Sequence, residues 1–404
     1  MSNIDTLWVI ISSALVMLMI PGLAFFYGGL IRGKNVLSTV SHSFVMLILI
    51  PILWYMFGYS LAFSPNGNGF LGDLSYAFFN DVNYYPSKIY AKTIPHQSFA
   101  MFQMMFACLT PALISGAFAE RKKFSSFLMF SLLWVTFVYC PLAHCVWSKN
   151  GWLANLGILD FAGGTVVHIS SGISALICAI VLGNRIDFKE KIHPHNIPLT
   201  MIGVALLWFG WFGFNAGSAL GVNKIAMYAF TNTHISAASG GLTWLIIGLI
   251  LSKKPRSINI GNGIISGLVG ITPAAGFVDV YASIVIGVVS SMFCFLCIEY
   301  VVKNRIDDSI DVFGIHGIGG IVGALLTGIF ANKDINIDGQ NGLLYGNSSL
   351  LWYQLVSVIV TILYVSIISY ILLKIVNFFI GLRVSAQDEI EGLDKTIHDE
   401  IAYK

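Results

Sequence analysis

The sequence predicts an all-α polytopic membrane protein with eleven transmembrane helices. Of its 404 residues, 56% are hydrophobic and only 10% are charged, whereas a soluble globular domain contains roughly 25% charged residues. A helix needs about 20 apolar residues to cross the hydrocarbon core of a bilayer, and uncharged runs of that length recur along almost the whole chain. Because these runs are too numerous to form the core of one soluble domain, we expect most of them to lie in a membrane.

Each predicted helix is an apolar run of sufficient length bounded by polar or charged residues. The first run follows residues 1–5, which contain no Lys or Arg, and it ends without the small-residue cleavage site of a signal peptide, so we expect it to be retained as a helix. The eleven predicted helices cover residues 6–27, 36–63, 97–119, 124–147, 160–182, 197–220, 228–252, 258–276, 281–302, 312–331 and 350–378.

Four prolines, Pro21, Pro51, Pro111 and Pro273, fall inside these predicted helices. Neighbouring helices in a membrane can satisfy the carbonyl groups that an internal proline frees. We therefore expect kinked rather than interrupted helices.

Glycines at a spacing of four residues let helix backbones approach closely, so we expect them to serve packing. These glycines are Gly213, Gly217, Gly221, Gly263, Gly267, Gly319 and Gly323.

The basic residues of the loops predict the orientation of the helices. The loops on one side of the membrane would contain thirteen Lys and Arg residues, and the opposite loops five. Because Lys and Arg are enriched in cytoplasmic loops, this asymmetry predicts an N-terminus outside the cell and a C-terminus inside it. The thirteen residues are Arg32, Lys34, Arg121, Lys122, Lys123, Arg185, Lys189, Lys191, Lys253, Lys254, Arg256, Lys303 and Arg305.

The odd number of helices predicts an inverted repeat. If helices one to five form one half and helices six to ten the other, the two halves cross the membrane in opposite directions, as in many transporters. The eleventh helix then stands outside the repeat. The fifth helix would open at Asp160 with His168 eight positions on. The tenth would open near Asp311 with His316 five positions on, which supports the pairing of the two halves.

His168 and His316 are the two deepest titratable side chains, apart from Cys and Tyr. At a rise of about 1.5 Å per residue, the two histidines approach the membrane midplane from opposite sides. Ionisable residues at that depth usually face a cavity or a partner. A facing pair of imidazoles could line a path for a small hydrogen-bonding solute or relay a proton. A structural hydrogen bond between helices and metal binding are the alternatives.

Aromatic residues that could line such a path are not distinguished by the sequence pattern alone. Phe106 and Phe214 could face lipid, and Trp147, at the end of a helix, could belong to the interfacial aromatic belt. These residues would be functional if a cation arrived at a dry mouth lined by rings, where an aromatic face is worth roughly 0.5–2 kcal/mol.

Several functional classes are disfavoured. The motifs HExxH and GxSxG are absent and no two carboxylates share a deep helix face, so we do not expect an enzyme. Cys294 and Cys297 match CxxC in spacing only, without a second ligand pair, so we expect no metal and no cofactor. No basic run suggests nucleic acid.

The sequence predicts a membrane domain at 1–378 and a tail at 379–404. In isolation this tail would be a solvated acidic segment.

Six stretches and two tail elements together resemble a known family. They are PGLAFFYGGLIRGKNVLS at 21–38, GAFAERKKFS at 116–125, AHCVW at 143–147, LDFAGGTVVHISSG at 159–172, WFGFNAGSA at 211–219, DVFGIHGIGGIVG at 311–323, and GLR and EGLD in the tail. The chain resembles the ammonium transporter family (Amt, Mep and Rh proteins) along nearly its whole length. Trp147 favours the bacterial Amt branch, with its AmtB-like channels, over the Rh proteins.

The resemblance implies a homotrimer of eleven-helix protomers with the N-terminus outside, each with its own pore, in the bacterial inner (cytoplasmic) membrane. It implies that Trp147, Ser218 and Phe106 recruit ammonium at the outer mouth, with Trp211 near the base of that site. It also implies that Phe106 and Phe214 form a stacked gate.

Further roles follow from the same resemblance. His168 and His316 would be the twin histidines of the pore, and Asp160 a structural and electrostatic carboxylate near the mouth. The tail motif would bind a PII-type (GlnK-like) signalling trimer, because three tails on a three-fold axis match a three-fold partner. This motif comprises Glu391, Gly392, Leu393 and Asp394.

The leading functional hypothesis is therefore an ammonium channel that binds ammonium outside, removes its proton and conducts ammonia inward. A bare cation is far more costly to carry through a narrow apolar pore than the neutral molecule. The alternative is an ammonium sensor that uses the same fold to signal to a cytoplasmic partner.

Overall fold

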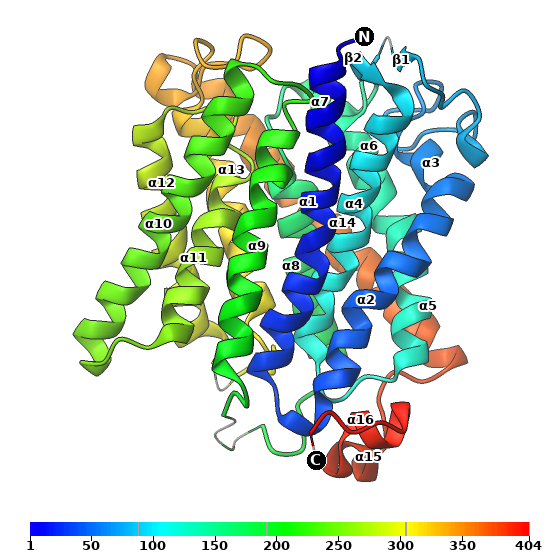
Figure 1. The fold of residues 1–404 in the computed structure, drawn as a ribbon, viewed down its shortest axis with the longest axis vertical. Helices are drawn as coiled ribbons and strands as arrows, with labels where there is room; N and C mark the ends of the chain where they lie inside the picture. The colour runs from blue at the N-terminus through cyan, green and yellow to red at the C-terminus, as the bar shows by residue number, and fades with distance from the viewer. Residues whose placement is uncertain (88, 189, 191–192, 304, 404) are drawn as a thin grey trace.

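The computed structural model describes residues 1–87, 89–188, 190, 193–303 and 305–403. They form a bundle in which the long helices lie side by side and run mostly along one axis (Figure 1). The N-terminus lies at one end of this bundle and the C-terminus at the opposite end (Figure 1).

The first part of the chain, up to α8, contains helices and one small antiparallel hairpin, β1–β2. Of the short elements, η2, η5 and η6 are π-helical. The elements are α1 (Asn3–Leu30), η1 (Gly33–Asn35), α2 (Val36–Leu53), η2 (Trp54–Gly58), α3 (Tyr59–Phe63), η3 (Ala77–Phe79), β1 (Pro86–Ser87), β2 (Ala91–Pro95), α4 (His96–Ile114), η4 (Ser115–Phe118), α5 (Phe124–Trp134), η5 (Val135–Tyr139), α6 (Cys140–Trp147), α7 (Trp152–Leu156), η6 (Gly164–Ile169) and α8 (Ser170–Leu182).

The rest of the chain is helical between its loops, and here η7 and η8 are π-helical. The elements are α9 (Ile197–Gly217), α10 (Lys224–Ser252), α11 (Ser257–Ile271), α12 (Val280–Cys297), η7 (Ile298–Val302), η8 (Phe313–Gly317), α13 (Ile318–Phe330), η9 (Leu343–Tyr345), α14 (Ser348–Phe379), α15 (Ala386–Glu391) and α16 (Leu393–His398).

Within the described residues, ten helical stretches are long and apolar enough to cross a membrane, so the chain is a multi-pass membrane protein. They correspond to ten of the eleven predicted helices. The remaining prediction, 258–276, corresponds to α11, which has only 15 residues. The expectation that Pro273 lies inside this helix is wrong. Pro273 has no N–H for the helical ladder, and Ala274 N donates to Ile271 O three residues back at 2.9 Å, so the chain continues in turns. The prolines inside helices, as predicted, are Pro21, Pro51 and Pro111.

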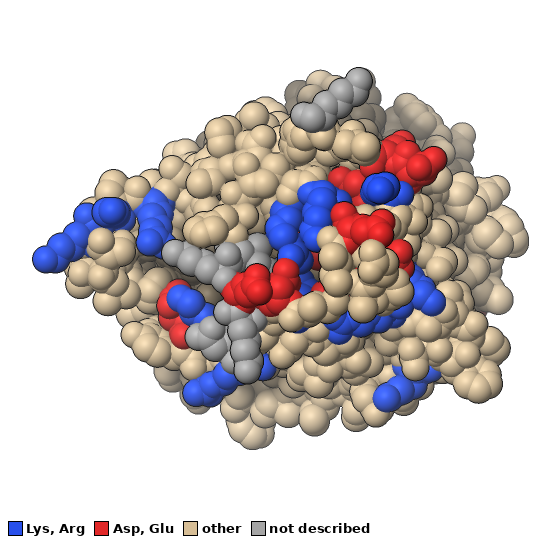
Figure 2. All heavy atoms as spheres, turned by 90° about the horizontal axis from the view of Figure 1, so that it is seen from below, with Lys and Arg blue, Asp and Glu red and all other residues tan. Residues whose placement is uncertain are grey.

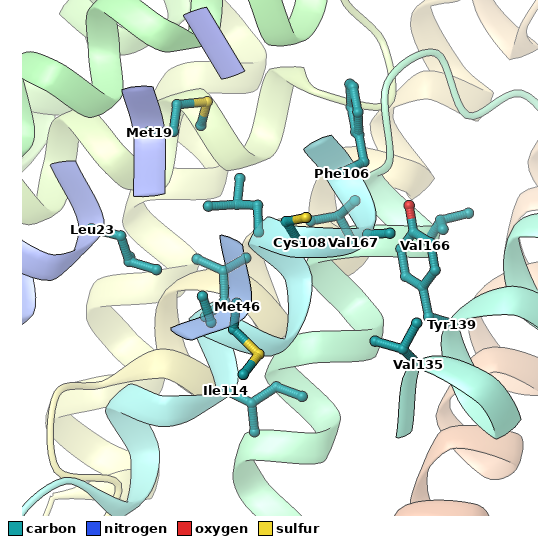
Figure 3. Close-up of a cluster of buried hydrophobic side chains, with 14 of the residues drawn as sticks. Met19, Leu23, Met46, Phe106, Cys108, Ile114, Val135, Tyr139, Val166 and Val167 are labelled. Atoms are coloured by element: carbon teal, nitrogen blue, oxygen red, sulfur yellow. The ribbon is translucent and has the colours of Figure 1, made fainter. Parts of the chain in front are cut away.

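A continuous apolar core runs through the bundle. Figure 3 shows part of it, to which α1 contributes Met19 and Leu23 and α4 contributes Phe106 and Cys108. The predicted packing role of the glycines is confirmed: a Cβ atom on Gly263 would lie 2.6 Å from the carbonyl oxygen of Gly240 on the neighbouring α10.

The tail is not a solvated segment. Its helices α15 and α16 fold back against the end of the bundle that holds the C-terminus (Figure 1). The Asp394 carboxylate accepts hydrogen bonds from the backbone N–H groups of Leu37 (3.0 Å) and Ser38 (2.8 Å), so it caps the N-terminus of α2. Leu393 N donates to the Asn35 side chain at 2.8 Å. The composition of the tail in isolation is misleading because two of its acidic groups, Glu389 and Asp394, accept hydrogen bonds from the membrane domain.

The closest approach between α8 and η8 is at Gly172. A Cβ atom at this position would overlap the backbone nitrogen and Cα of Gly317. We therefore expect Gly172→Ala to lower the free energy of unfolding by about 1–3 kcal/mol, the usual cost of overpacking. Gly28→Ala is the matched control, because its Cβ would meet the Val40 side chain at an ordinary 3.4 Å. The measurement is the thermal unfolding midpoint of each purified variant in detergent, and equal midpoints would contradict the expectation.

Candidate functional site

The imidazoles of His168 and His316 form a buried, hydrogen-bonded pair. Their Nδ1 atoms are 3.2 Å apart, and their ring centroids are 5.2 Å apart with planes inclined by 23°. One Nδ1 must donate and the other accept, so the two neutral rings have different tautomers. The Nε2 atom of His168 has no hydrogen-bond partner within the described residues. A small donor or acceptor could therefore bind at this nitrogen.

Both histidines lie in π-helical turns that open a helix, His168 in η6 and His316 in η8. Such π turns occur frequently at functional sites. Small residues bring the first turn against the helix that continues from the second: a Cβ on Gly320 in α13 would lie 2.9 Å from the carbonyl oxygen of Gly164 in η6. Only a close approach of these backbones allows the imidazoles to reach each other.

Asp160 caps the first of these turns. Its Oδ1 accepts hydrogen bonds from the N–H groups of Gly163 (2.9 Å) and Gly164 (2.6 Å). Its Oδ2 accepts from Thr165 (2.8 Å) and Val166 (3.2 Å). Burial raises the pKa of Asp160, and these four N–H groups oppose that rise. Both carboxylate oxygens are engaged, so the geometry supports the structural part of the role implied for Asp160.

The second helix opens next to Asp311, as expected: it begins at Val312, and the carbonyl oxygen of Asp311 accepts from Ile315 N at 2.9 Å. The capping carboxylate, however, is that of Asp308, whose Oδ2 accepts from Phe313 N at 2.7 Å. Asp308 precedes His316 by eight residues, the same interval as between Asp160 and His168. This spacing could have identified it in the sequence, but the nearer carboxylate obscured it.

Aromatic rings continue from the histidines toward the other end of the bundle. Phe214 lies 5.9 Å from His168, and Phe106 lies 4.4 Å from Phe214, both measured between ring centroids. Both phenylalanines are buried. Phe106 and Phe214, predicted as a pair, are therefore in contact, and they lie between the histidines and a pocket at the end of the bundle that holds the N-terminus. We call it the outer pocket because the predicted orientation places this end outside the cell.

The outer pocket has a volume of about 320 Å³ and contains Phe106, Trp147 and Ser218 together in its lining, as expected. The Trp147 ring is nearly perpendicular to that of Phe106 (85°), and its Nε1 donates to the carbonyl oxygen of Asp160 at 3.0 Å. Ser218 Oγ donates to the carbonyl oxygen of Phe214 at 2.9 Å.

Other lining residues of this pocket were not predicted. The side-chain oxygen of Gln103 is buried there without a hydrogen-bond partner in the described structure. Tyr90 also lines the pocket and bonds to Ser148 Oγ at 3.1 Å. Gln103 is an amide in the middle of the predicted helix 97–119, so a polar residue among apolar neighbours was an available signal.

Trp211 lies below the aromatic pair and not in the outer pocket. It stacks on His168 at 5.4 Å with an inclination of 21°, and its Nε1 donates to Thr272 Oγ1 at 2.9 Å. With His168 and His316 it lines a void of about 10 Å³ whose other walls are aliphatic or phenyl side chains. One water needs roughly 10–15 Å³. The void beside the histidines is therefore narrow, and its volume is at the lower limit for one water.

Charged side chains gather at the end of the bundle that holds the C-terminus, where Figure 2 shows acidic and basic groups adjacent to one another. Arg185 forms ion pairs with Glu120 (2.6 Å) and Asp307 (2.7 Å). Burial alone would raise the pKa of Glu120, but Arg32 and Arg185 outweigh it and hold this pKa at about 2. Sequence reasoning missed this network because its members are far apart in the chain.

The tail motif residues differ in accessibility. Leu393 and Asp394 are buried against the membrane domain, and Gly392 has a φ of +108° that favours glycine. Glu391 is exposed. Within the described residues, no group of three or more His, Cys, Asp or Glu side chains is placed to hold a metal ion.

Comparisons with known proteins agree along the whole chain. The model of the Ammonium Transporter Family matches residues 7–403. An ammonium transporter of Bacillus subtilis (strain 168) is 50% identical over 401 residues, which cover 99% of this chain and 98% of that protein. Ammonium transporter Amt1 of Archaeoglobus fulgidus is 49% identical over 404 residues, covering 100% of both chains.

Solved structures give the same result. Mep2 of Saccharomyces cerevisiae has a TM-score of 0.90 at 38% identity, over 96% of this chain and 88% of that one. A protein described as a sensor Amt protein has a TM-score of 0.90 at 30% identity, over 98% of each chain. The chain therefore belongs to the ammonium transporter family.

Proposed function

We propose that this ammonium transporter is a channel that recruits NH4+ in the outer pocket, removes its proton and conducts NH3 past His168 and His316. Ammonium transport is the activity of the family, whose members are transporters and channels rather than enzymes. The observation that carries the mechanism is the hydrogen-bonded histidine pair in a dry void of about 10 Å³.

Desolvation favours the neutral molecule in this void. An unpaired ion in an apolar environment loses its hydration at a cost of many kcal/mol, whereas a neutral polar molecule loses far less. An imidazole nitrogen can accept from an N–H of ammonia or donate to its lone pair, and the free Nε2 of His168 is available for this. Potassium has no proton to release, so the same void excludes it.

The outer pocket has the groups needed to hold the cation before its proton leaves. The faces of Phe106 and Trp147 supply cation–π attraction, and the buried oxygen of Gln103 supplies a hydrogen-bond acceptor. Ser218 adds a hydroxyl at the rim. We propose that Phe106 and Phe214, in contact at 4.4 Å, act as a gate and move apart to admit the solute.

The wider architecture is part of the same proposal. We infer two inverted five-helix repeats with helix eleven outside them, the N-terminus outside the cell, and a homotrimer in the bacterial inner membrane. Placement of the two termini at opposite ends of the bundle supports an odd number of crossings (Figure 1). The equal Asp–His spacing in η6 and η8, with a capping carboxylate in each, supports the repeat.

An ammonium sensor is the second candidate. The structural likeness to a protein described as a sensor Amt protein favours it. The described tail, which is folded against the membrane domain, offers an output element for such a signal. Currents evoked by ammonium distinguish a channel from a sensor that does not transport.

Replacing His168 or His316 by Ala should abolish or change proton-coupled ammonium transport and leave the trimer folded. Within the described residues, the only hydrogen bond of either imidazole is the one that joins them, so neither ring holds another element in place through a hydrogen bond. The measurement is ammonium-evoked current in proteoliposomes on a solid-supported membrane, with potassium and methylammonium as comparison solutes. A large loss of trimer thermostability in both variants would instead favour a structural role.

Replacing Trp147 by Leu should weaken the apparent ammonium affinity by no more than about tenfold, the value of one cation–π contact. The indole supplies a ring face to the pocket but no formal charge. Currents measured across a range of ammonium concentrations give this affinity. An unchanged concentration dependence would remove Trp147 from the recruitment site.

The tail should bind a PII-type (GlnK-like) trimer, with affinity supplied by three simultaneous attachments. Since Leu393 and Asp394 are buried, we expect the exposed Ile390 and Glu391 to make the contact and the buried pair to hold them in place. A pull-down with purified PII protein should recover full-length channel but neither a channel lacking 381–404 nor the double variant Ile390→Ala/Glu391→Ala. Asp279→Ala, at the N-cap of α12, is a control substitution outside the tail. Equal recovery by full-length and truncated channel would show that the tail is not the docking element.

A further inference from the structure

A second cavity, of about 240 Å³, lies beside the start of η8 and is lined largely by acidic residues. Two of its carboxylates have basic partners: Asp307 pairs with Arg185, and Glu299 with Lys303 at 2.7 Å. Asp308 and Asp311 form no ion pair among the described residues. The charged members of its lining are Arg185, Glu190, Glu299, Lys303, Asp307, Asp308 and Asp311.

Asp308 differs from the other carboxylates of this cavity because it is buried with one oxygen unused. Its side chain is 6% exposed, and Oδ1 has no hydrogen-bond partner in the described structure. Its Oδ2 accepts from Phe313 N at 2.7 Å. Asp160, at the same interval before the other histidine, uses both oxygens to accept four backbone N–H groups. Asp160 therefore has no oxygen that corresponds to the unbonded Oδ1 of Asp308.

The position of Asp308 connects the cavity to the histidine pair. It caps the turn at Phe313, and His316 follows three residues later, about 4.5 Å along the helix axis. Ile298, which lines the cavity, packs directly over Gly314 in the same turn. The cavity is therefore adjacent to the backbone that positions His316.

Within the described residues, no Lys, Arg or His forms an ion pair with the Asp308 carboxylate. Arg121 is the nearest cation, but its guanidinium donates to backbone carbonyls and to Ser309 Oγ at 2.6 Å. The other titratable neighbours are Tyr27 on α1, Cys297 on α12, and Asp307 and Asp311 on its own loop. Burial raises the pKa of the Asp308 carboxyl to about 6, because hydrogen bonds from the backbone at Phe313 and Val312 and the charge of Arg121 offset only part of the desolvation.

We propose that Asp308 is the proton-binding residue of the inner pore mouth, where it receives the proton that crosses the pore separately and returns it to the ammonia that leaves. This inference rests on the proposed deprotonation of ammonium. The Asp308 carboxylate binds the arriving proton on Oδ1. The Oδ1–H bond then breaks as the lone pair of NH3 takes the proton, which forms NH4+ and regenerates the carboxylate.

The direction of the pH dependence follows from this cycle. Above a pH of about 6 on the inner side, the carboxylate is ionised and can accept a proton. Below that pH it remains protonated and cannot accept another. Inward transport should therefore fall as the inner pH falls through this range.

The transport test compares Asp308→Asn, Asp308→Glu and the control Glu299→Gln in proteoliposomes. Asn retains an oxygen that can accept from Phe313 N but cannot carry the proton, whereas Glu299→Gln removes one negative charge from the same cavity. We expect Asp308→Asn to reduce the ammonium-evoked current by roughly 100-fold, the lower end of what one positioned proton-transfer group supplies. Asp308→Glu should recover part of the current, and Glu299→Gln should remain within about twofold of wild type. Wild-type current and an unchanged inner pH profile in Asp308→Asn would overturn the proposal.

An independent test uses infrared difference spectroscopy of the wild-type full chain without transport. With isotope-labelled aspartate, a protonated carboxyl band should titrate near pH 6 and be absent in Asp308→Asn. If no aspartate carboxyl of the wild-type protein titrates in that range, the proposal is wrong, whether or not the variants fold. If the band is present but wild-type protein carries no ammonium current, the proposed channel function fails while the proton-binding site stands.

Discussion

The arrangement around the proposed pore depends on the hydrogen bond between the Nδ1 atoms of His168 and His316. It requires two helix starts to meet inside the membrane, and each start leaves backbone N–H groups that no water can reach. Asp160 and Asp308 satisfy some of these groups. Gly172, which packs on the backbone of Gly317, allows the approach. The capping carboxylates and the glycines therefore allow the two imidazoles to come within hydrogen-bond distance.

The small volume and apolar lining of the void beside the histidines would determine which solutes can follow the proposed pore. Apolar side chains leave a void that is near the minimum for one water, and the contacting rings of Phe106 and Phe214 separate it from the outer pocket. Under the proposed function, this contact prevents a hydrated ion from passing until the two rings move apart. A cation can be stabilised only before this closure, where the ring faces and the oxygen of Gln103 are available.

At the end of the bundle that holds the C-terminus, charged side chains from segments far apart in the sequence form ion pairs. Asn35 connects two of its parts: its side chain accepts from Leu393 N in the tail and donates to Glu120 at 2.8 Å. Glu120 in turn pairs with Arg185, next to Asp307. The docked tail and the loops around the inner cavity thus belong to one hydrogen-bonded network. A change in tail position would alter the hydrogen bonds at the N-terminus of α2 and at Glu120.

The sequence by itself determined the membrane character and ten of the helices, and it singled out His168 and His316, because long apolar runs and intramembrane histidines are local signals. The pairing of Phe106 with Phe214 came only from the resemblance to the family. The sequence placed the start of the tenth helix near Asp311 but did not reveal Asp308 as its capping carboxylate, and it extended α11 through Pro273. Only the tertiary structure placed Trp211 beside His168 rather than in the outer pocket, and gave the acidic tail its partners. These features depend on contacts between residues far apart in the chain, whose geometry no local pattern contains.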